Sequence, residues 1–279
     1  TVPGLLPPLD DAAALATTVI ASAAGEGPIV GLHRQAPFRA PHHTLSYAAM
    51  VGGGPRLTPG EVTRADHGVL FLDELAEFDR DVLEALRQPL EEGVVRIARA
   101  GGVVTFPARF QLIAAMNPCP CGYAGSIPED RCRCSHDLVE RYERRVSGPL
   151  RDRIDLWVTM TRIPAASLVA PGDAESTADV APRIAAARAH SLARNSGRSN
   201  GRLRGRALRA ACRLDESVRR RAVDLADGEA ASGRGTERLL RVARTIADLD
   251  GADAVRVAHI EEAAYFRSGA ERAAEALAS

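Results

Sequence analysis

Lysine is missing from this sequence: all 36 basic residues among its 279 amino acids are arginines. A P-loop of the form Gly-x-x-x-x-Gly-Lys-[Ser/Thr] needs its lysine to reach the β- and γ-phosphates of a nucleotide. No such segment is present. The chain is therefore either not a nucleotide enzyme or a part of one that begins after the P-loop.

Other features are scarce as well. Aromatic residues make up 4% of the chain and the formal net charge is zero, so the total charge indicates no polyanionic partner. No apolar run reaches the ~18 residues of a membrane-spanning helix, and the N-terminus has no signal-peptide pattern, so we expect a cytoplasmic protein without a membrane partner. The five cysteines are compatible with a reducing compartment if four of them hold a metal.

The arginines are unevenly distributed. Between Arg183 and Arg220 there are eleven arginines and only two acids, Asp215 and Glu216. Clustered arginines neutralise nucleic-acid phosphates, so this segment favours DNA as a partner.

The stretch 68–75 (GVLFLDEL) is the most informative segment of the chain, and the other motifs are interpreted relative to it. Its four consecutive apolar residues predict a buried parallel strand, and Asp73 and Glu74 follow at the carboxyl end, where open α/β sheets bind ligands. Asp73 is suited to orient Mg²⁺ and Glu74 to polarise an attacking water, as in a Walker B element. The alternative is an ordinary buried strand followed by acids at a helix N-terminus.

Before this strand, Asp10 is expected to cap a helix that runs to about Ala24 and stops at Gly25. Residues 26–67 are rich in Gly and Pro and read as a functional insert rather than a packed element. Within it, His42 and His43 are either metal ligands or hydrogen-bonded surface residues, and the lack of a partner spacing favours the second.

After this strand, Asp79 is expected to cap a helix that Pro89 ends or kinks. Residues 94–98 and 103–106 then predict a β-hairpin, on which Arg96 and Arg99 either contact phosphates or form a solvated edge. Residues 110–116 predict another buried strand. Asn117 at its end either positions the attacking water or caps the turn.

Two Cys-x-Cys pairs follow the second strand. Cys119 and Cys121 come first, and Cys132 and Cys134 stand close behind them. Four cysteines in a cytoplasmic-type chain indicate a tetrahedral Zn²⁺ site, with free thiols or a disulfide as the alternative. Cys212 stands apart and is expected to pack as a small apolar residue.

A helix is expected to end near Gly148, with a strand beginning at Ile154. An arginine just before such a strand is where an arginine finger acts, although an ion pair with Asp152 or Asp155 is equally consistent. Residues 164–180 have the composition of a linker, and the rest is helical.

Six segments together resemble the bacterial magnesium-chelatase-like ATPases of the ComM/YifB family, which are AAA+ proteins. The segments are PFRAPHHTLSYAAMVGGG (37–54), PGEVTRADHGVLFLDEL (59–75), LRQPLEEG (86–93), TFPARFQLIAAMNPCPCGY (105–123), SGPLRDRIDL (147–156) and RVARTIADL (241–249). The resemblance implies an α/β fold: an AAA+ P-loop NTPase-type parallel sheet, lacking its first strand and P-loop, followed by a small α-helical lid domain. The expected boundaries are an ATPase core over 1–163, a linker over 164–180 and the lid over 181–279.

The resemblance also implies residue roles. Asp73 and Glu74 would form Walker B, Asn117 would be sensor 1, and Arg153 would be the arginine finger, with Arg151 as its rival. Arg234, or else Arg238, would be sensor 2, contacting the ATP whose Mg²⁺ Asp73 binds. The insert with His42 and His43 and the hairpin with Arg96 and Arg99 would face DNA in a central channel. Cys119, Cys121, Cys132 and Cys134 match the family's cysteine pairs.

The functions that follow are of three classes. The first is the motor portion of a homohexameric AAA+ helicase that drives DNA branch migration in natural transformation. The second is a magnesium-chelatase ATPase subunit. The third is a non-enzymatic remnant that binds Zn²⁺ and DNA. The cysteine pairs and the PFRAPHH segment favour the first.

Overall fold

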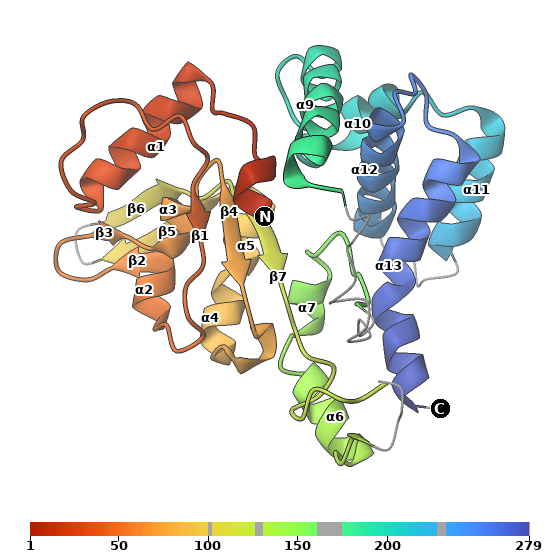
Figure 1. Ribbon diagram of the computed structural model, residues 1–279, viewed down its shortest axis with the longest axis horizontal. Coiled ribbons are helices and arrows are strands. Elements are labelled where there is room, and N and C mark those ends of the chain that lie inside the picture. Colours follow the sequence, from red (N-terminus) through yellow and green to blue (C-terminus); the bar gives the residue numbers. More distant parts are fainter. Residues whose placement is uncertain (100–101, 126–130, 161–174, 228–232, 279) are drawn as a thin grey trace. The chain divides into compact units, whose positions relative to one another are not determined.

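A computed structural model describes residues 1–99, 102–125, 131–160, 175–227 and 233–278 of the chain (Figure 1). The chain packs as two units, Thr1–Ile154 and Asp155–Ser279. The first combines a parallel sheet with short helices, and the described part of the second is helical.

The sheet of the first unit has the strand order β1-β4-β7, with β1 at Phe38–Arg39, β4 at Val69–Leu72 and β7 at Gln111–Ala114. Both neighbours run parallel to β4 (Figure 1). The apolar run after Gly68 therefore forms the predicted buried central strand. A Cβ at Gly68 would lie 2.0 Å from the carbonyl oxygen of Pro37, so only glycine allows β1 to approach this closely.

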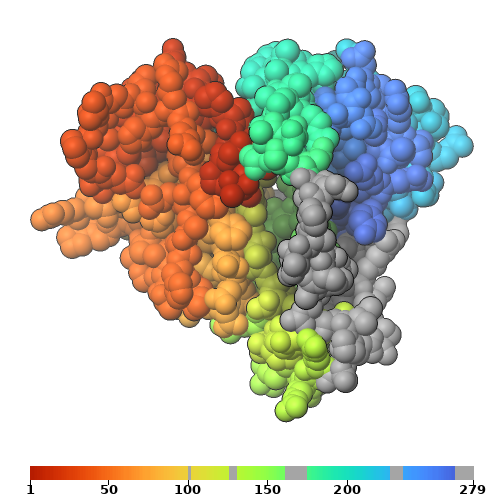
Figure 2. Space-filling model, viewed as in Figure 1, coloured from red at the N-terminus to blue at the C-terminus, as the bar shows by residue number. Residues whose placement is uncertain are grey.

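The remaining elements of the first unit connect these strands. They are η1 (Val2–Leu5), α1 (Asp11–Ala23), α2 (Tyr47–Val51), β2 (Gly52–Gly53), β3 (Thr58–Pro59), α3 (Glu61–Arg64), η2 (Leu75–Glu77), α4 (Arg80–Ala85), α5 (Arg87–Glu92), β5 (Val94–Arg99), β6 (Gly102–Pro107), α6 (His136–Glu143) and α7 (Gly148–Arg151). As predicted, Asp10 caps α1: its Oδ1 accepts the N–H of Ala13 at 2.8 Å. Figure 2 shows α1 and the segment after it, in red to orange, on the surface of this unit.

The expectation that residues 26–67 form no packed element was wrong. Met50 of α2 and Val62 of α3 are fully buried in the core of the first unit, together with Leu70 and Leu72 of β4. The segment also supplies strand β1. Its elements span two to five residues, too short for a hydrophobic period to emerge, and this is why the sequence pattern missed them.

The kink expected at Pro89 is confirmed. Helix α4 ends at Ala85 and α5 begins at Arg87, with Pro89 in its first turn. Proline lacks an N–H and its ring clashes with the carbonyl four residues earlier, here that of Ala85, so a continuous helix cannot form. The predicted hairpin is also confirmed: β5 and β6 pair antiparallel from Val94–Pro107 to Arg99–Gly102.

Two expectations near the end of the first unit were wrong. A helix begins rather than ends at Gly148, because Ser147 caps it and accepts the N–H of Leu150. The described residues after Ile154 form no strand. The backbone N–H of Trp157 bonds instead to the carbonyl of Phe266 in a helix, at 2.8 Å.

In the second unit, α12 (Gly233–Leu249) packs against the elements around it (Figure 1). These are α9 (Thr177–Arg194), η4 (Asn200–Arg202), α10 (Gly205–Cys212), α11 (Glu216–Asp227) and α13 (Val257–Ala278). Helix α9 begins inside the segment expected to be a linker, because Ser176 and Asp179 form a capping box. Among the described residues, no helix combines the length and the hydrophobicity that a bilayer crossing requires.

Candidate nucleotide site and thiol cluster

The carboxyl ends of three parallel strands gather the polar residues of the first unit. Asp73 and Glu74 directly follow β4, Asn117 follows β7, and His42 and His43 follow β1. The backbone N–H of Leu75 bonds to the carbonyl of Ala115 at 2.9 Å, which joins the segments that follow β4 and β7. Parallel strands place their carboxyl ends at one edge of the sheet, where α/β folds bind ligands.

Glu74 has a left-handed backbone, with φ 52° and ψ 47°. A non-glycine residue in this region is uncommon and costs about 1 kcal/mol or more. Backbone contacts on both sides hold it there. Its N–H donates to Oδ1 of Asp73 at 2.9 Å, and its carbonyl accepts the N–H of Glu77 at 2.7 Å. The sharp turn presents two adjacent carboxylates to solvent at the end of a buried strand.

Both carboxylates are accessible. Asp73 and Glu74 are exposed, whereas Leu72 immediately before them is fully buried. Asp73 keeps Oδ2 without a contact within the described residues. A carboxylate oxygen with access to water is a ligand that Mg²⁺ prefers, so the donor chemistry of Asp73 fits this ion. Asn117 is also exposed, with its side chain near Gly122.

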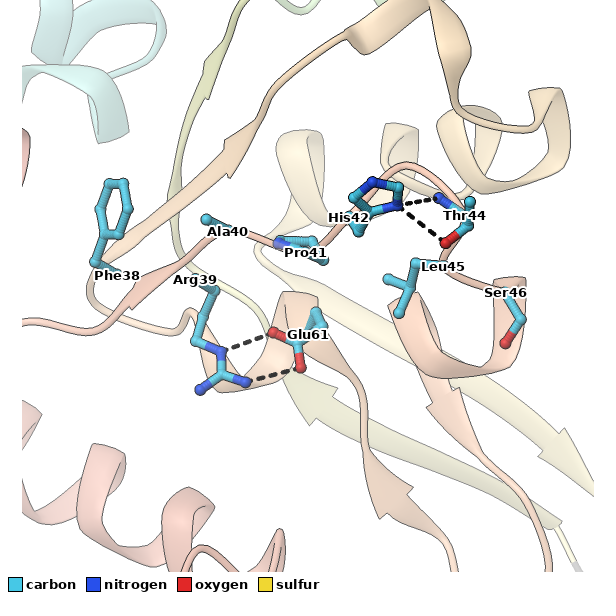
Figure 3. A pocket seen from close by; sticks show the side chains of 9 residues that line it. All are labelled: Phe38, Arg39, Ala40, Pro41, His42, Thr44, Leu45, Ser46 and Glu61. Atoms are coloured by element: carbon cyan, nitrogen blue, oxygen red, sulfur yellow. Dashed lines mark hydrogen bonds and ion pairs between the residues drawn. The ribbon is translucent and has the colours of Figure 1, made fainter.

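The adjacent histidines have different partners. His43 Nδ1 lies 2.9 Å from Oε2 of Glu74. His42 Nδ1 lies 3.0 Å from Oγ1 of Thr44 and accepts the Thr44 N–H at 3.4 Å (Figure 3). His42 also lines an open pocket of about 570 Å³. Both histidines therefore make hydrogen-bond contacts here, and their expected contact with DNA stays a prediction.

The same pocket contains an ion pair that the sequence did not reveal. Arg39 of β1 donates from Nε and Nη2 to the two carboxylate oxygens of Glu61, at 2.7 and 2.9 Å (Figure 3). This hydrogen bond with Glu61 raises the pKa of Arg39. Burial opposes ionisation of Glu61, but the bonds from Arg39 and Arg64 outweigh it and hold the pKa of Glu61 below its usual value. The pair fastens β1 to α3.

Arg153 and Arg151 both bond within the first unit. Arg153 donates to the carbonyl of Pro149 at 2.7 Å and pairs with Glu91 of α5. Arg151 donates to the carbonyl of Glu143 at the end of α6, at 3.2 Å. An ion pair for Arg153 was the alternative weighed from the sequence, but its partner is Glu91 rather than Asp152 or Asp155.

The hairpin arginines also have partners. Arg96 pairs with Glu92 at the end of α5, and Arg99 donates to the carbonyls of Gly54 and Pro55. Both arginines remain exposed. The contact of Arg99 joins the hairpin to the turn between β2 and β3.

The four cysteines of the two pairs converge, with all sulfur atoms within 4.8 Å of one another. Sγ of Cys119 lies 3.3 Å from that of Cys121 and 3.8 Å from that of Cys132. Neighbouring sulfurs of a tetrahedral zinc site lie about 3.8 Å apart, given zinc–sulfur distances of about 2.3 Å, whereas a disulfide needs about 2.05 Å. The donor set therefore fits Zn²⁺ and not a disulfide.

The thiols of the cluster differ in acidity. Hydrogen bonds from the Tyr123 backbone and from Cys119 lower the pKa of Cys121 to about 6. A backbone bond with Cys121 favours the thiolate of Cys134, but desolvation and the nearby Cys121 and Cys119 outweigh it and raise the pKa of Cys134 to about 12. Crowded thiols resist joint ionisation unless a cation balances their charge.

Cys212 lies apart in the second unit, buried in the helical core as expected. The side chain of Arg234 lies outside the described residues. Arg238 is on the same helix, α12, where its Nε is buried.

Residues 1–168 match the family model described as magnesium chelatase, subunit ChlI, and residues 174–267 match the model of its C-terminal part. The chain belongs to the magnesium chelatase subunit ChlI family. Its relatives include YifB of Escherichia coli, 41% identical over 269 residues, which are 95% of this chain and 52% of YifB.

Further relatives extend the match. Protein Rv2897c of Mycobacterium tuberculosis is 43% identical over 280 residues, covering 97% of this chain and 54% of that protein. The competence protein ComM of Haemophilus influenzae is 41% identical over 267 residues, covering 95% of this chain and 52% of ComM. The chain thus spans about half the length of the curated relatives it matches. Membership of the ChlI family, with relatives such as ComM and YifB, supports an AAA+ ATPase-like protein.

Proposed function

We propose that this chain is the motor portion of a AAA+ ATPase that couples ATP hydrolysis to DNA branch migration. The observation that carries the proposal is the exposed pair Asp73 and Glu74, held by a left-handed turn at the end of a buried parallel strand. An ordinary strand followed by acids that cap a helix does not require a left-handed backbone conformation at the second acid. Strained positions of this kind gather where side chains act on a ligand.

Each polar residue has a role in this proposal. Asp73 orients Mg²⁺ and its waters, Glu74 polarises the attacking water, and Asn117 positions that water. Arg234 or Arg238 contacts the ATP phosphates. Bound ATP and Mg²⁺ would supply the phosphoryl chemistry. The residues of the chain would position the ATP phosphates and the metal and polarise the attacking water.

A DNA partner is supported by two observations. The relative ComM is named a competence protein, which favours a role with DNA in natural transformation. Arg206 and Arg209 of α10 and Arg213 after it are exposed, and within the described residues none of their side chains has a hydrogen bond or ion pair. Uncommitted guanidinium groups along a helix suit DNA phosphates. Arg96 and Arg99, by contrast, could bind DNA phosphates only by giving up the contacts that they make here with Glu92 and with the carbonyls of Gly54 and Pro55.

The four converging cysteines support a structural Zn²⁺ site. Zinc would tie residues 119–121 to residues 132–134 and so fix the chain between β7 and α6. The unfolded chain has no preformed site, so the free energy of zinc binding adds to the free energy of folding. Zinc would therefore stabilise the first unit.

Substitution of Glu74 tests the proposal. The Glu74→Gln variant is assayed in a polypeptide that carries this chain together with a Walker A segment. ATP binding should remain, and turnover should fall about 10²- to 10⁴-fold, the range for loss of a general base. Asp81→Asn, an exposed carboxylate on α4, is the matched control and should leave turnover unchanged. Full turnover in the Glu74→Gln variant would refute the assignment.

The 279-residue chain by itself gives a second test. Without lysine and without a Gly-rich phosphate cradle, it should neither bind nor hydrolyse ATP usefully. Isothermal titration with MgATP checks this, and micromolar affinity with Mg²⁺-dependent turnover would contradict it.

A further inference from the structure

The contact between His43 and Glu74 joins residues that are far apart in sequence. Strand β1 runs parallel to β4, with Phe38 opposite Val69 and Arg39 opposite Leu70. Both strands therefore end at the same edge of the sheet. The segment after β1 then brings His43 Nδ1 to 2.9 Å from Oε2 of Glu74.

The proton of this contact is on His43. An ionised carboxylate only accepts hydrogen bonds, so Nδ1 of His43 carries the proton and donates it. In His42, by contrast, Nδ1 accepts the N–H of Thr44. The two adjacent imidazoles therefore use the same ring nitrogen in opposite ways, and only His43 is directed to the carboxylate.

The ring of His43 has two aromatic neighbours. Phe78, which is fully buried, lies edge-on to it, with ring centroids 6.4 Å apart and an interplanar angle of 79°. The ring of His42 is also close to it, with centroids 4.1 Å apart and an interplanar angle of 34°. A ring fixed in this way is a firm donor rather than one of many rotamers on a loop.

Glu74 needs such an anchor. Its turn fixes the backbone, but the side chain is 49% exposed and has three rotatable bonds. An unrestrained glutamate loses rotamer freedom when it adopts one conformation, which is unfavourable. A hydrogen bond from His43 to Oε2 restricts the side chain before ATP binds, so less rotamer freedom is lost later. Oε1 stays available for the attacking water.

We propose that His43 is a positioning residue for Glu74: its Nδ1–H holds one carboxylate oxygen so that the other faces the water that attacks ATP. This inference rests on the proposed function, since it assigns His43 a task only if Glu74 polarises that water. His43 itself touches neither nucleotide nor water in this scheme.

Two substitutions at His43 distinguish the contribution of its N–H donor from that of the imidazole ring. Asparagine carries an amide N–H near the place of Nδ1, whereas alanine carries no donor. In a polypeptide with a Walker A segment, His43→Ala should lower kcat about 10- to 100-fold, the range for a misplaced catalytic group. The KM for ATP should change less than twofold, and His43→Asn should recover most of kcat. Arg34→Ala, a solvated residue before β1, is the control and should behave as wild type.

A spectroscopic readout does not depend on activity. ¹⁵N-detected NMR of the histidine rings in the nucleotide-free 279-residue chain should find the proton of His43 on Nδ1. In the Glu74→Ala variant it should redistribute toward Nε2. An unchanged distribution would overturn the contact.

The outcomes separate this inference from the proposed function. Wild-type kcat in His43→Ala, together with an inactive Glu74→Gln, would overturn the role of His43 and leave the proposed function standing. Full activity in Glu74→Gln would overturn the proposed function itself. A His43→Asn variant as impaired as His43→Ala, with unchanged melting temperatures in both, would also refute the donor role.

Discussion

Arg244 and Asp248 form an ion pair one turn apart on α12, with Nη2 2.9 Å from Oδ1 and at most 1% of either side chain exposed. The same carboxylate accepts from Arg194 of α9, at 2.5 and 2.8 Å, and from Asn200 at 2.8 Å. Arg244 also donates to the carbonyl of Asp253 at 3.0 Å. This buried network ties α9 and η4 to the central helix of the second unit.

The first prediction concerns the stability of this unit. Asp248→Ala leaves two arginines without their shared carboxylate, and breaking one side of a buried pair costs about 3–5 kcal/mol. Thermal and urea unfolding should register a loss of that size. Glu261→Ala removes the partner of Arg221 in an exposed ion pair and should cost less than about 1 kcal/mol. Equal losses in the two variants would contradict the role of the buried network.

The second prediction is the acid dependence of this stability. Burial disfavours the Asp248 carboxylate, but hydrogen bonds from Arg194 and Asn200 and the charge of Arg244 outweigh it and lower its pKa. The stabilisation is therefore fully present above the pKa of an unfolded aspartate, about 3.9. It is lost as the pH falls through the lower folded pKa. Urea unfolding from pH 6 to 2 should show a smaller acid-linked loss in Asp248→Asn than in wild type.

Zinc content provides the third prediction. Purified protein should carry about one Zn²⁺ per chain, and Cys119→Ser should lower both the metal content and the melting temperature. Metal analysis and calorimetry measure the two quantities.

Cys212→Ser is the matched control for the zinc prediction. Cys212 lies in the other unit, where burial raises its pKa to about 11, so its loss should leave zinc content unchanged even if stability falls. Metal-free wild-type protein with four freely titrating thiols and an unchanged melting temperature in Cys119→Ser would rule out the site.

DNA binding gives the fourth prediction. Phosphate contacts make affinity fall with salt and carry no sequence information, so binding should be steeply salt-dependent with little base preference. Replacing both Arg206 and Arg209 by alanine should reduce the slope of log K against log salt by about 1.4 for single strands. Fluorescence anisotropy with labelled oligonucleotides measures this slope.

A charge-matched control accompanies the DNA measurement. Arg34 and Arg144 are exposed arginines of the first unit that pair with Asp11 and Glu140. Their double alanine variant removes the same charge and should keep the wild-type slope. Alanine at Arg96 and Arg99 tests the hairpin separately. No retained DNA near physiological salt in wild type would exclude the α10 arginines as an interface.

The sequence predicted the elements whose pattern is local. Residues 69–72 form an uninterrupted apolar run, and the hairpin and α1 have clear turn and capping residues. The convergence of Cys119 and Cys132 also followed from residue type and spacing. Each of these depends on neighbours in the chain, which a sequence displays directly.

What the sequence did not reveal depends on distant partners. Arg244 lies in a helix rich in arginine, which is typical of a solvated face, yet tertiary contacts bury it completely. The contact of His43 with Glu74 requires that β1 be recognised, and a two-residue strand has no period. One signal was present in the sequence: two histidines follow a short segment flanked by prolines, and in the fold they lie at the edge of the sheet where Asp73 follows β4.

The last prediction concerns the arginine finger, and it requires a complete ATPase with its Walker A segment. Arg153 pairs with Glu91 within its own chain here, and 17% of its side chain is exposed. As a finger, it would leave this contact to neutralise charge on the γ-phosphate bound by a second copy, an effect of about 10³–10⁵ in rate. Arg153→Ala should therefore be nearly inactive while still binding ATP.

Mixing variants tests whether Arg153 acts on the neighbouring copy. Glu74→Gln inactivates a subunit's own site, whereas Arg153→Ala inactivates the adjacent one. Some interfaces in a mixed assembly then combine an intact Glu74 with an intact Arg153, so ATPase activity should partly recover. The same variants assayed separately are the control. Full activity in Arg153→Ala, or no recovery although the subunits co-assemble, would contradict the assignment, and Arg151 would be the next residue to substitute.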